Sequence, residues 1–309
     1  MKIFFNRVPR YEPYGGGNQF LIAIVKALTT LGHNIVYHLE EDIDLIFMMD
    51  PRPGDIGYSL QHIAGYKQAH PDVKIVHRVN ECDQRKGTDN IDRLLLAGMN
   101  ISDNVIFISQ WLKSYFEERG FSKKSSVIYN GCNTDHFKPS SKDVFNKKIK
   151  LVTHHWSDNW MKGFDLYTML DEYLLDFPDV DIEFTYIGRY YKDYQPSATK
   201  IIEPTHGIDL GNKLNEHDIY ITASRFEPCG MHHVEGSASG LPVIFHKDGG
   251  GINELCRNHG ESFGTFDEFL VALEKIKSNM AFYKEKIDYK YLSMTRCVDS
   301  YIKVIETMK

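Results

Sequence analysis

Short apolar runs alternate with amphipathic segments along about the first 110 residues of the chain. The runs KIFFN, NIVYHL, DLIFMM, KIVHRVN and NVIFIS are rich in β-branched and aromatic residues, as buried strands are. Apolar residues from Phe20 to Leu31 recur at steps of three and four, which predicts a helix, and Gly32 supplies a stop at its C-terminus. A further helix is predicted near residues 57–70. This alternation predicts βαβ units around a parallel sheet.

The same alternation returns in the second half of the chain. KLVTHHW, DIEFTYIG, DIYITAS and LPVIFH are predicted strands. Helices are predicted from about Phe164, near Leu210 and from about Gly230, and the tail is predicted to be helical from about Phe266. The second half therefore predicts another parallel α/β unit.

A polar, lysine-rich stretch at residues 138–150 (KPSSKDVFNKKIK) separates the two halves and is typical of a surface linker. Because 309 residues exceed the usual size of one hydrophobic core, we expect two doubly wound, Rossmann-like domains, 1–140 and 141–309. Ligands bind such sheets at the carboxyl ends of the strands, so we expect the two sheets to face a central cleft.

Composition narrows the classes of function. The formal charge of −6 and the pI of about 6.2 give no overall positive field, so nucleic acid is not an expected partner. The apolar run at the start is too short for a signal peptide, and no stretch is long enough for a transmembrane segment, so we expect a cytoplasmic protein. The five cysteines lack metal-ligand spacing, which indicates reduced thiols and neither a disulfide framework nor a zinc site.

The most informative segment is SRFEPCGMHHVEGSASGLPVIFHKDGGGINE, residues 224–254. A strand ends near Ser224, Glu227 follows in a loop, and a helix from about Gly230 carries Glu235. The N–H groups in the first turn of a helix have no partner within it and form a ready site for a phosphate or a sugar hydroxyl. The alternative is that both glutamates are ordinary solvated charges.

Glu227 and Glu235, with seven residues between them, resemble the glutamate pair of retaining GT-B glycosyltransferases of the family 4-like type (glycosyl transferases group 1). The phrase SRFEPCG is also similar to the starch and glycogen synthase version of this motif. The resemblance, over about residues 1–260, implies a GT-B fold, in which Glu235 grips the ribose of a nucleotide-sugar donor and Glu227 holds the transferred sugar. It implies further donor contacts at neighbouring positions, namely Cys229, Gly230, Met231 and His232.

A lysine is expected at the donor diphosphate. In KLVTHHWSDNWMKGFDLY, Lys162 stands where family members have a lysine before a glycine and a helix, and a fixed cation would stabilise the charge left on the departing phosphate. Many relatives also have an arginine five residues earlier, and this chain has Ser157 there. Ser157, or one of the preceding His154 and His155, could hydrogen-bond the phosphate; alternatively these residues finish the strand and pack.

No metal ion or cofactor is expected. The triplets 42–44 and 179–181, each Asp-X-Asp, imitate the metal motif of another glycosyltransferase fold but are interpreted as polar starts of strands. Backbone amides and Lys162 would neutralise the charge of the donor diphosphate. The nucleotide sugar, whose base is unknown, is expected as a co-substrate.

The first domain is expected to serve the acceptor side. Gly15, Gly16 and Gly17 follow the first strand, where missing side chains would let the backbone approach a ligand; a flexible turn is the alternative. The resemblance places them against the donor phosphates or the acceptor. Asn80 stands roughly where many relatives have a histidine at the reactive face of the sugar, which makes it a catalytic candidate with Glu227 and Lys162.

A charged loop follows Asn80. Glu81, Asp83, Arg85 and Lys86 are candidates for acceptor contacts, and a solvated charged loop is the equal alternative. Asn130 and Gly131 are expected to shape the turn that leads to the second domain.

The resemblance implies a metal-independent, retaining glycosyltransferase that moves a sugar from a nucleotide sugar to a hydroxyl of a glycan or another acceptor. A GT-B phosphorylase, a sugar-nucleotide epimerase and a non-catalytic nucleotide-sugar-binding domain remain as alternatives. An epimerase would need no acceptor, and a phosphorylase would need inorganic phosphate.

Overall fold

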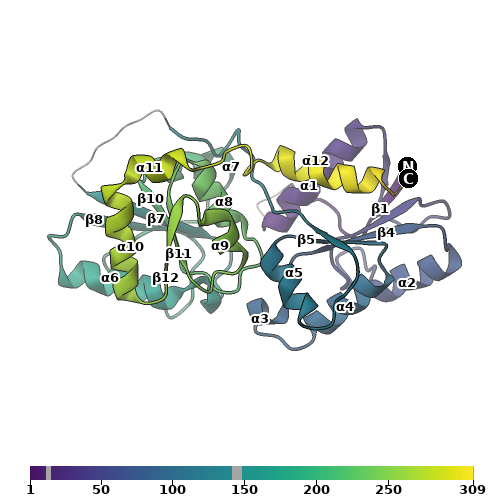
Figure 1. Ribbon diagram of the computed structural model, residues 1–309, viewed down its shortest axis with the longest axis horizontal. Coiled ribbons are helices and arrows are strands. Elements are labelled where there is room, and N and C mark those ends of the chain that lie inside the picture. Colours follow the sequence, from purple (N-terminus) through teal and green to yellow (C-terminus); the bar gives the residue numbers. More distant parts are fainter. Residues whose placement is uncertain (12–14, 141–147, 309) are drawn as a thin grey trace. The chain divides into compact units, whose positions relative to one another are not determined.

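The computed structural model describes residues 1–11, 15–140 and 148–308. Contacts divide the chain into a first unit, Met1–Tyr129 with Thr295–Lys309, and a second unit, Asn130–Met294. Each unit is built on a six-stranded sheet with helices packed against it (Figure 1). Every strand pair between the described strands is parallel, which confirms the predicted class of two doubly wound α/β units.

The first sheet has the strand order β2-β1-β3-β4-β5-β6. Its strands are β1 (Lys2–Phe5), β2 (Asn34–Val36), β3 (Leu45–Met48), β4 (Lys74–Val79), β5 (Asn104–Phe107) and β6 (Ser125–Val127). The helices of this unit are α1 (Gly16–Thr30), α2 (Leu60–Ala69), α3 (Asp83–Lys86), α4 (Ile91–Ile101), α5 (Gln110–Glu117) and α12 (Met294–Glu306). The order of the strands reverses between β1 and β3, which makes their carboxyl ends a topological switch point.

The last helix, α12, packs on the first unit. The Tyr301 ring is fully buried, with its centroid 4.6 Å from that of Phe20 in α1 and 6.0 Å from that of Phe47 in β3. Figure 1 shows α12 beside α1. The sequence assigns the whole helical tail to the second domain, whereas the contacts assign α12 to the first unit, because its apolar face is covered there.

The division between the units also differs from the predicted boundary. It falls after Tyr129, whereas the sequence predicts a boundary at residue 140. Residues 141–147 of the predicted linker lie outside the described residues.

The second sheet has the strand order β12-β11-β10-β7-β8-β9. Its strands are β7 (Ile149–His155), β8 (Ile182–Gly188), β9 (Lys200–Ile202), β10 (Ile219–Thr222), β11 (Val243–His246) and β12 (Gly260–Phe263). The helices are α6 (Phe164–Asp176), α7 (Gly207–Leu214), α8 (Met231–Ala238), α9 (Gly251–Cys256), α10 (Phe266–Ser278) and α11 (Met280–Glu285), and η1 (Trp160–Lys162) is a 3-10 turn. Here the switch point lies between β7 and β10.

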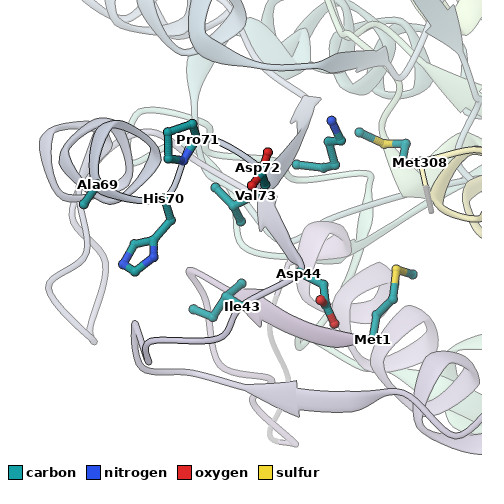
Figure 2. Close-up of a pocket in the computed structure, with 10 residues that line it drawn as sticks. Met1, Ile43, Asp44, Ala69, His70, Pro71, Asp72, Val73 and Met308 are labelled. Atoms are coloured by element: carbon teal, nitrogen blue, oxygen red, sulfur yellow. The ribbon is translucent and has the colours of Figure 1, made fainter.

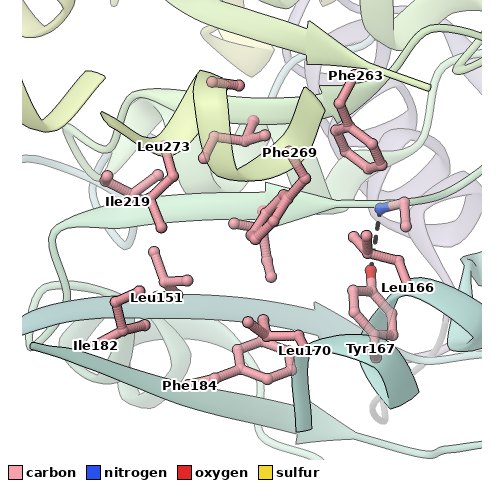
Figure 3. Close-up of a cluster of buried hydrophobic side chains, with 14 of the residues drawn as sticks. Leu151, Leu166, Tyr167, Leu170, Ile182, Phe184, Ile219, Phe263, Phe269 and Leu273 are labelled. Atoms are coloured by element: carbon pink, nitrogen blue, oxygen red, sulfur yellow. Dashed lines mark hydrogen bonds between the residues drawn. The ribbon is translucent and has the colours of Figure 1, made fainter. Parts of the chain in front are cut away.

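Helices α6 and α10 cover one face of the second sheet. Phe184 of β8, Ile219 of β10 and Phe269 of α10 are buried in one apolar cluster (Figure 3). Burial of side chains of this size contributes about 1.5–3 kcal/mol each. The Tyr167 ring of α6 lies in the same cluster, and its hydroxyl accepts a hydrogen bond from the Ala223 N–H at 3.2 Å. The core thus extends to the carboxyl end of β10, where the predicted site residues begin.

Gly163 connects η1 to α6 in a position that no other residue fits. Its φ of +93° lies in the left-handed region, and a Cβ there would overlap the Cβ and carbonyl of Ala223, just after β10. Gly236 has a similar function in α8, because a Cβ at this position would overlap the ring of Tyr220 in β10. These two glycines bring η1 and α8 close to the carboxyl end of β10.

We predict that Gly163→Ala destabilises the second unit by about 2–4 kcal/mol, because a strained φ and a steric overlap act together. Gly65→Ala is the matched control. Gly65 lies inside α2 and is exposed, and no atom of the described part of the chain lies within 4 Å of an added Cβ, so alanine should stabilise by about 0.5–1 kcal/mol. Urea denaturation measures both changes, and equal stability of Gly163→Ala and the parent would contradict the assignment.

Candidate functional site

The predicted donor residues gather at the carboxyl ends of β7 and β10 in the second unit. The loop after β7 leads through η1 to α6, and the loop after β10 leads to α8. Since the two strands are neighbours in the sheet, segments about 65 residues apart meet at the switch point. This is the place where ligands bind in open α/β sheets.

Lys162 and Glu227 form an ion pair at this switch point. The Lys162 Nζ lies 2.8 Å from the Glu227 Oε2, and the two side chains are only 11% and 12% exposed. Asn159 helps to fix η1, because its Oδ1 accepts the Met161 N–H at 2.8 Å. The lysine predicted for phosphate and the glutamate predicted for sugar are therefore partners, and neither is the solvated charge of the alternative interpretation.

The loop that carries Glu227 is held in an unusual conformation. Phe226 has a φ of +52°, the only positive φ of a non-glycine residue among residues 1–11, 15–140 and 148–308. Its N–H donates to the Asp248 carbonyl at 2.7 Å, and the Glu227 carbonyl accepts the Gly251 N–H at 2.8 Å. Conformations of this kind cost about 1–3 kcal/mol and cluster at functional sites.

Glu235 lies in the second turn of α8 and contacts a histidine. Its Oε2 is 2.8 Å from the Nε2 of His154, at the end of β7, and the side chains are 15% and 10% exposed. The other ring nitrogen of His154, Nδ1, lies 3.1 Å from the Tyr220 hydroxyl of β10. The sequence offered no signal for this contact, because the three residues lie on separate elements.

Further histidines are buried beneath these carboxylates. His232 Nε2 lies 3.0 Å from the Thr222 Oγ1, and the rings of His155 and His232 have centroids 4.7 Å apart. Burial lowers the pKa of His232 well below its usual range and that of His233 to about 3. Both rings are therefore neutral at pH 7 and supply no cation to a phosphate. His154 and His155 are buried at the end of β7, and a hydrogen bond from either to a phosphate stays a prediction.

The remaining predicted donor residues line the start of α8 and the end of β7. Gly230 precedes α8, and an added Cβ would lie 2.7 Å from the His232 ring. Cys229 is buried, and its carbonyl accepts the Asn130 side-chain N–H at 2.6 Å, so Asn130 stabilises the motif loop. Met231 is the first residue of α8, and Ser157 is exposed after β7. Their donor contacts stay predictions.

Two residues near this site escaped the sequence analysis. Arg189, which directly follows β8, has its guanidinium 4.2 Å from the centroid of the exposed Trp156 ring. Arg225 pairs with Asp165 in the first turn of α6. Isolated arginines give no pattern in the sequence from which either contact could be found.

In the first unit, the three glycines stand at the start of α1. Gly15 precedes the helix with an ordinary φ of −60°, and Gly16 and Gly17 are its first two residues. Among the described residues, an added Cβ would meet no atom within 4 Å at Gly15, and at Gly17 only the Asn80 Nδ2, at 3.8 Å. Neither backbone strain nor packing requires these two glycines, and Asn80 lies beside Gly17.

The charged loop after Asn80 is tied to its own unit. Glu81, with a side chain 13% exposed, pairs with Arg52 and with Lys86, the latter at 3.3 Å. The Asp83 carboxylate accepts backbone N–H groups in the first turn of α4 at 2.9–3.0 Å and so caps that helix. The Arg85 side chain is buried. Lys86 is exposed, as in the solvated alternative, whereas Glu81 and Arg85 are not, and contacts of these residues with an acceptor stay predictions.

No group of three or more His, Cys, Asp or Glu side chains in the part of the chain that the structure describes could hold a metal ion. Asp44 and Asp181 directly precede β3 and β8, as the polar starts of strands do. All five cysteines lie among the described residues, are buried and form no disulfide. No helix among the described residues is long and apolar enough to cross a membrane.

A cavity of about 650 Å³ in the first unit lies away from these residues (Figure 2). Its lining includes Asp44, Asp72, Lys74 and Met308. Asp44 directly precedes β3 and Lys74 begins β4, so the cavity is at the amino edge of the sheet. It contains none of the predicted site residues.

Solved structures of other proteins superpose on nearly the whole chain. Sucrose-phosphate synthase from Thermosynechococcus elongatus superposes with a TM-score of 0.73 and 12% identity, covering 99% of this chain and 98% of that one. Anabaena HepE in complex with UDP-glucose gives 0.76 and 17%, covering 99% and 100%. The chain has the GT-B fold. This confirms the fold that the glutamate motif predicted.

Comparison of sequences matches a smaller part of the chain. A probable sucrose-phosphate synthase from Thermosipho melanesiensis is 26% identical over 208 residues, 59% of this chain. The match spans 47% of that protein, about half of its length. No protein-family model matches the chain.

Acid should destabilise this GT-B chain through its buried histidines. Burial lowers the pKa of His233 to about 3. Below pH 6.5 the His233 imidazole is therefore protonated in the unfolded chain but stays neutral in the folded protein. Stability is therefore lost as the pH falls from about 6.5 towards 3, by about 2 kcal/mol for this histidine between pH 6.5 and 5.0. Urea denaturation of His233→Gln at pH 6.5 and 5.0 should show a loss of unfolding free energy that is smaller than that of the parent by about 2 kcal/mol. An unchanged loss would refute the burial argument.

Proposed function

We propose that the chain is a glycosyltransferase that takes a sugar from a nucleotide-sugar donor held by the second unit. The observation that carries this proposal is the buried Lys162–Glu227 pair beside Glu235, at the switch point of a GT-B sheet. Anabaena HepE, which has the same fold, has been solved with UDP-glucose, and the two sucrose-phosphate synthases are named for a sugar transfer. These likenesses support a nucleoside diphosphate sugar as donor.

Each polar side chain then has a role in the proposed complex. Glu235 accepts hydrogen bonds from the ribose hydroxyls, and Lys162, with the first-turn amides of α8, holds the diphosphate without a metal ion. Glu227 accepts hydrogen bonds from hydroxyls of the transferred sugar. Because Lys162 is paired with Glu227, the diphosphate has to share the ammonium with this carboxylate.

The proposed reaction retains the anomeric configuration, as the resemblance implies. The bond between the anomeric carbon and the phosphate oxygen breaks, the acceptor oxygen bonds the same carbon on the same face, and the acceptor proton passes to a donor phosphate oxygen. Lys162 stabilises the growing negative charge of the leaving phosphate. The first unit is proposed to bind the acceptor hydroxyl at its own strand ends, where Asn80 and Gly17 lie side by side.

The donor prediction concerns Glu235. In thermal-shift assays with UDP-, ADP- and GDP-glucose in the presence of EDTA, the true donor at a hundred times its dissociation constant should stabilise the parent by about 2.7 kcal/mol. Glu235→Ala should weaken donor binding by roughly 10- to 150-fold, because the ribose hydroxyls lose a charged acceptor. Glu274→Ala, which removes an exposed glutamate of α10, is the control. Equal affinities in the Glu235 and Glu274 variants would remove Glu235 from the site.

The leaving-group prediction concerns Lys162. Lys162→Ala should lower kcat by about 100-fold or more, with a smaller effect on donor affinity, because its charge matters most in the transition state. Lys162→Arg, which keeps the charge and a partner for Glu227, should restore part of the loss. Steady-state kinetics on variants with an unchanged melting temperature measure this, and an alanine variant with the kcat of the parent would exclude the role.

A further inference from the structure

His154 stands between a carboxylate and a phenol inside the second unit. Its Nε2 is 2.8 Å from the Glu235 Oε2, and its Nδ1 is 3.1 Å from the Tyr220 Oη. The backbone N–H of His154 also donates to the Tyr220 hydroxyl at 3.2 Å. The three side chains come from β7, α8 and β10, and His154 and Tyr220 are buried.

The carboxylate fixes the direction of the hydrogen bond between His154 and Glu235. A carboxylate only accepts, so the proton of the imidazole must be on Nε2, from which it is donated to Glu235. The Tyr220 hydroxyl lies 3.1 Å from Nδ1 and 3.3 Å from the His154 carbonyl, to which it donates, so Tyr220 holds both the ring and the backbone of His154. Burial raises the pKa of Tyr220 well above its usual value, so this hydroxyl keeps its proton. Contacts therefore connect Tyr220 through His154 to Glu235.

The same tyrosine also sets the position of the helix that carries Glu235. Gly236 packs on the Tyr220 ring, where an added Cβ would overlap it. The Tyr220 side chain of β10 therefore contacts both the backbone of α8 and the ring of His154. The Oε2 atom of Glu235 contacts His154, and no hydrogen bond from the described residues reaches Oε1.

We propose that His154 is a positioning residue that holds the Glu235 carboxylate ready for the ribose hydroxyls of the donor. This inference rests on the proposed function. A glutamate side chain that is already ordered loses less conformational freedom when the nucleotide binds, so its hydrogen bonds contribute more to affinity. Since the transferred sugar and the leaving phosphate lie elsewhere, His154 acts on donor affinity and not on the chemical step.

The test compares two substitutions of similar size. Gln places an amide N–H near the position of Nε2 and can still donate to Glu235, whereas Asn is too short to do so. We expect His154→Asn to weaken binding of UDP, ADP or GDP, whichever the parent binds, by roughly 10-fold, with kcat within about twofold of the parent. His154→Gln should stay within about threefold in both quantities.

The 2′-deoxy form of the same nucleotide separates positioning from a general structural effect. Loss of positioning should lower the preference for the ribonucleotide over the deoxynucleotide in His154→Asn, as it does in Glu235→Gln, and the double variant should add little to either single change. Structural damage would weaken binding of both nucleotides equally and leave the preference for the ribonucleotide unchanged. That result would overturn the inference. Tyr220→Phe, which keeps the ring against Gly236, should lower the preference in part and serves if His154→Asn does not fold.

The two proposals fail in different ways. A parent that binds none of UDP, ADP and GDP overturns the proposed function and the role of His154 with it. A parent that binds one of them, with the ribose preference intact in both His154→Asn and Tyr220→Phe, overturns the role of His154 alone.

Discussion

The close approach of Gly163 to Ala223 is the constraint on which the site of the second unit depends. It lets the chain leave β7 through η1, pass against the end of β10 and enter α6 with no side chain in between. Two distant segments are thereby held together, and the Arg225 N–H donates to the Met161 carbonyl at 3.0 Å. The buried ion pair between the two loops forms because the backbone is fixed in this way. A larger residue at position 163 would separate the loops and the charges with them.

The two glutamates of the motif have different partners, and this separates their proposed tasks. Glu227 lies against the ammonium of Lys162, so its charge is balanced within the site. Glu235 lies against the imidazole of His154, 2.8 Å from its Nε2. A carboxylate balanced by an ammonium suits hydroxyls next to a negative diphosphate, because it adds little repulsion. A carboxylate held by an imidazole suits the ribose, which offers two hydroxyl donors.

Much of this structure follows from local patterns, and the rest depends on contacts between distant residues. The strands and helices with strong periodicity were predictable, and so was the motif of Glu227 and Glu235, since it lies within one loop and one helix. The sequence does not predict the short strands β6 and β9 or the helix α4. Its N-terminus is capped from outside by Asp83, which a search for a local capping residue does not find. That α12 returns to the first unit depends on the burial of Tyr301.

The pairing of Lys162 with Glu227 was also beyond the sequence, and it changes the electrostatic argument. The sequence suggested a lysine ready for phosphate, yet Lys162 with Glu227 and Glu235 sums to one positive and two negative charges. Since His232 and His233 are neutral, they do not alter this sum. Under the proposed function, a diphosphate has to share the Lys162 ammonium with Glu227. Because Glu227 also accepts hydrogen bonds from the sugar hydroxyls in this proposal, binding of the phosphate and binding of the sugar are coupled through one lysine.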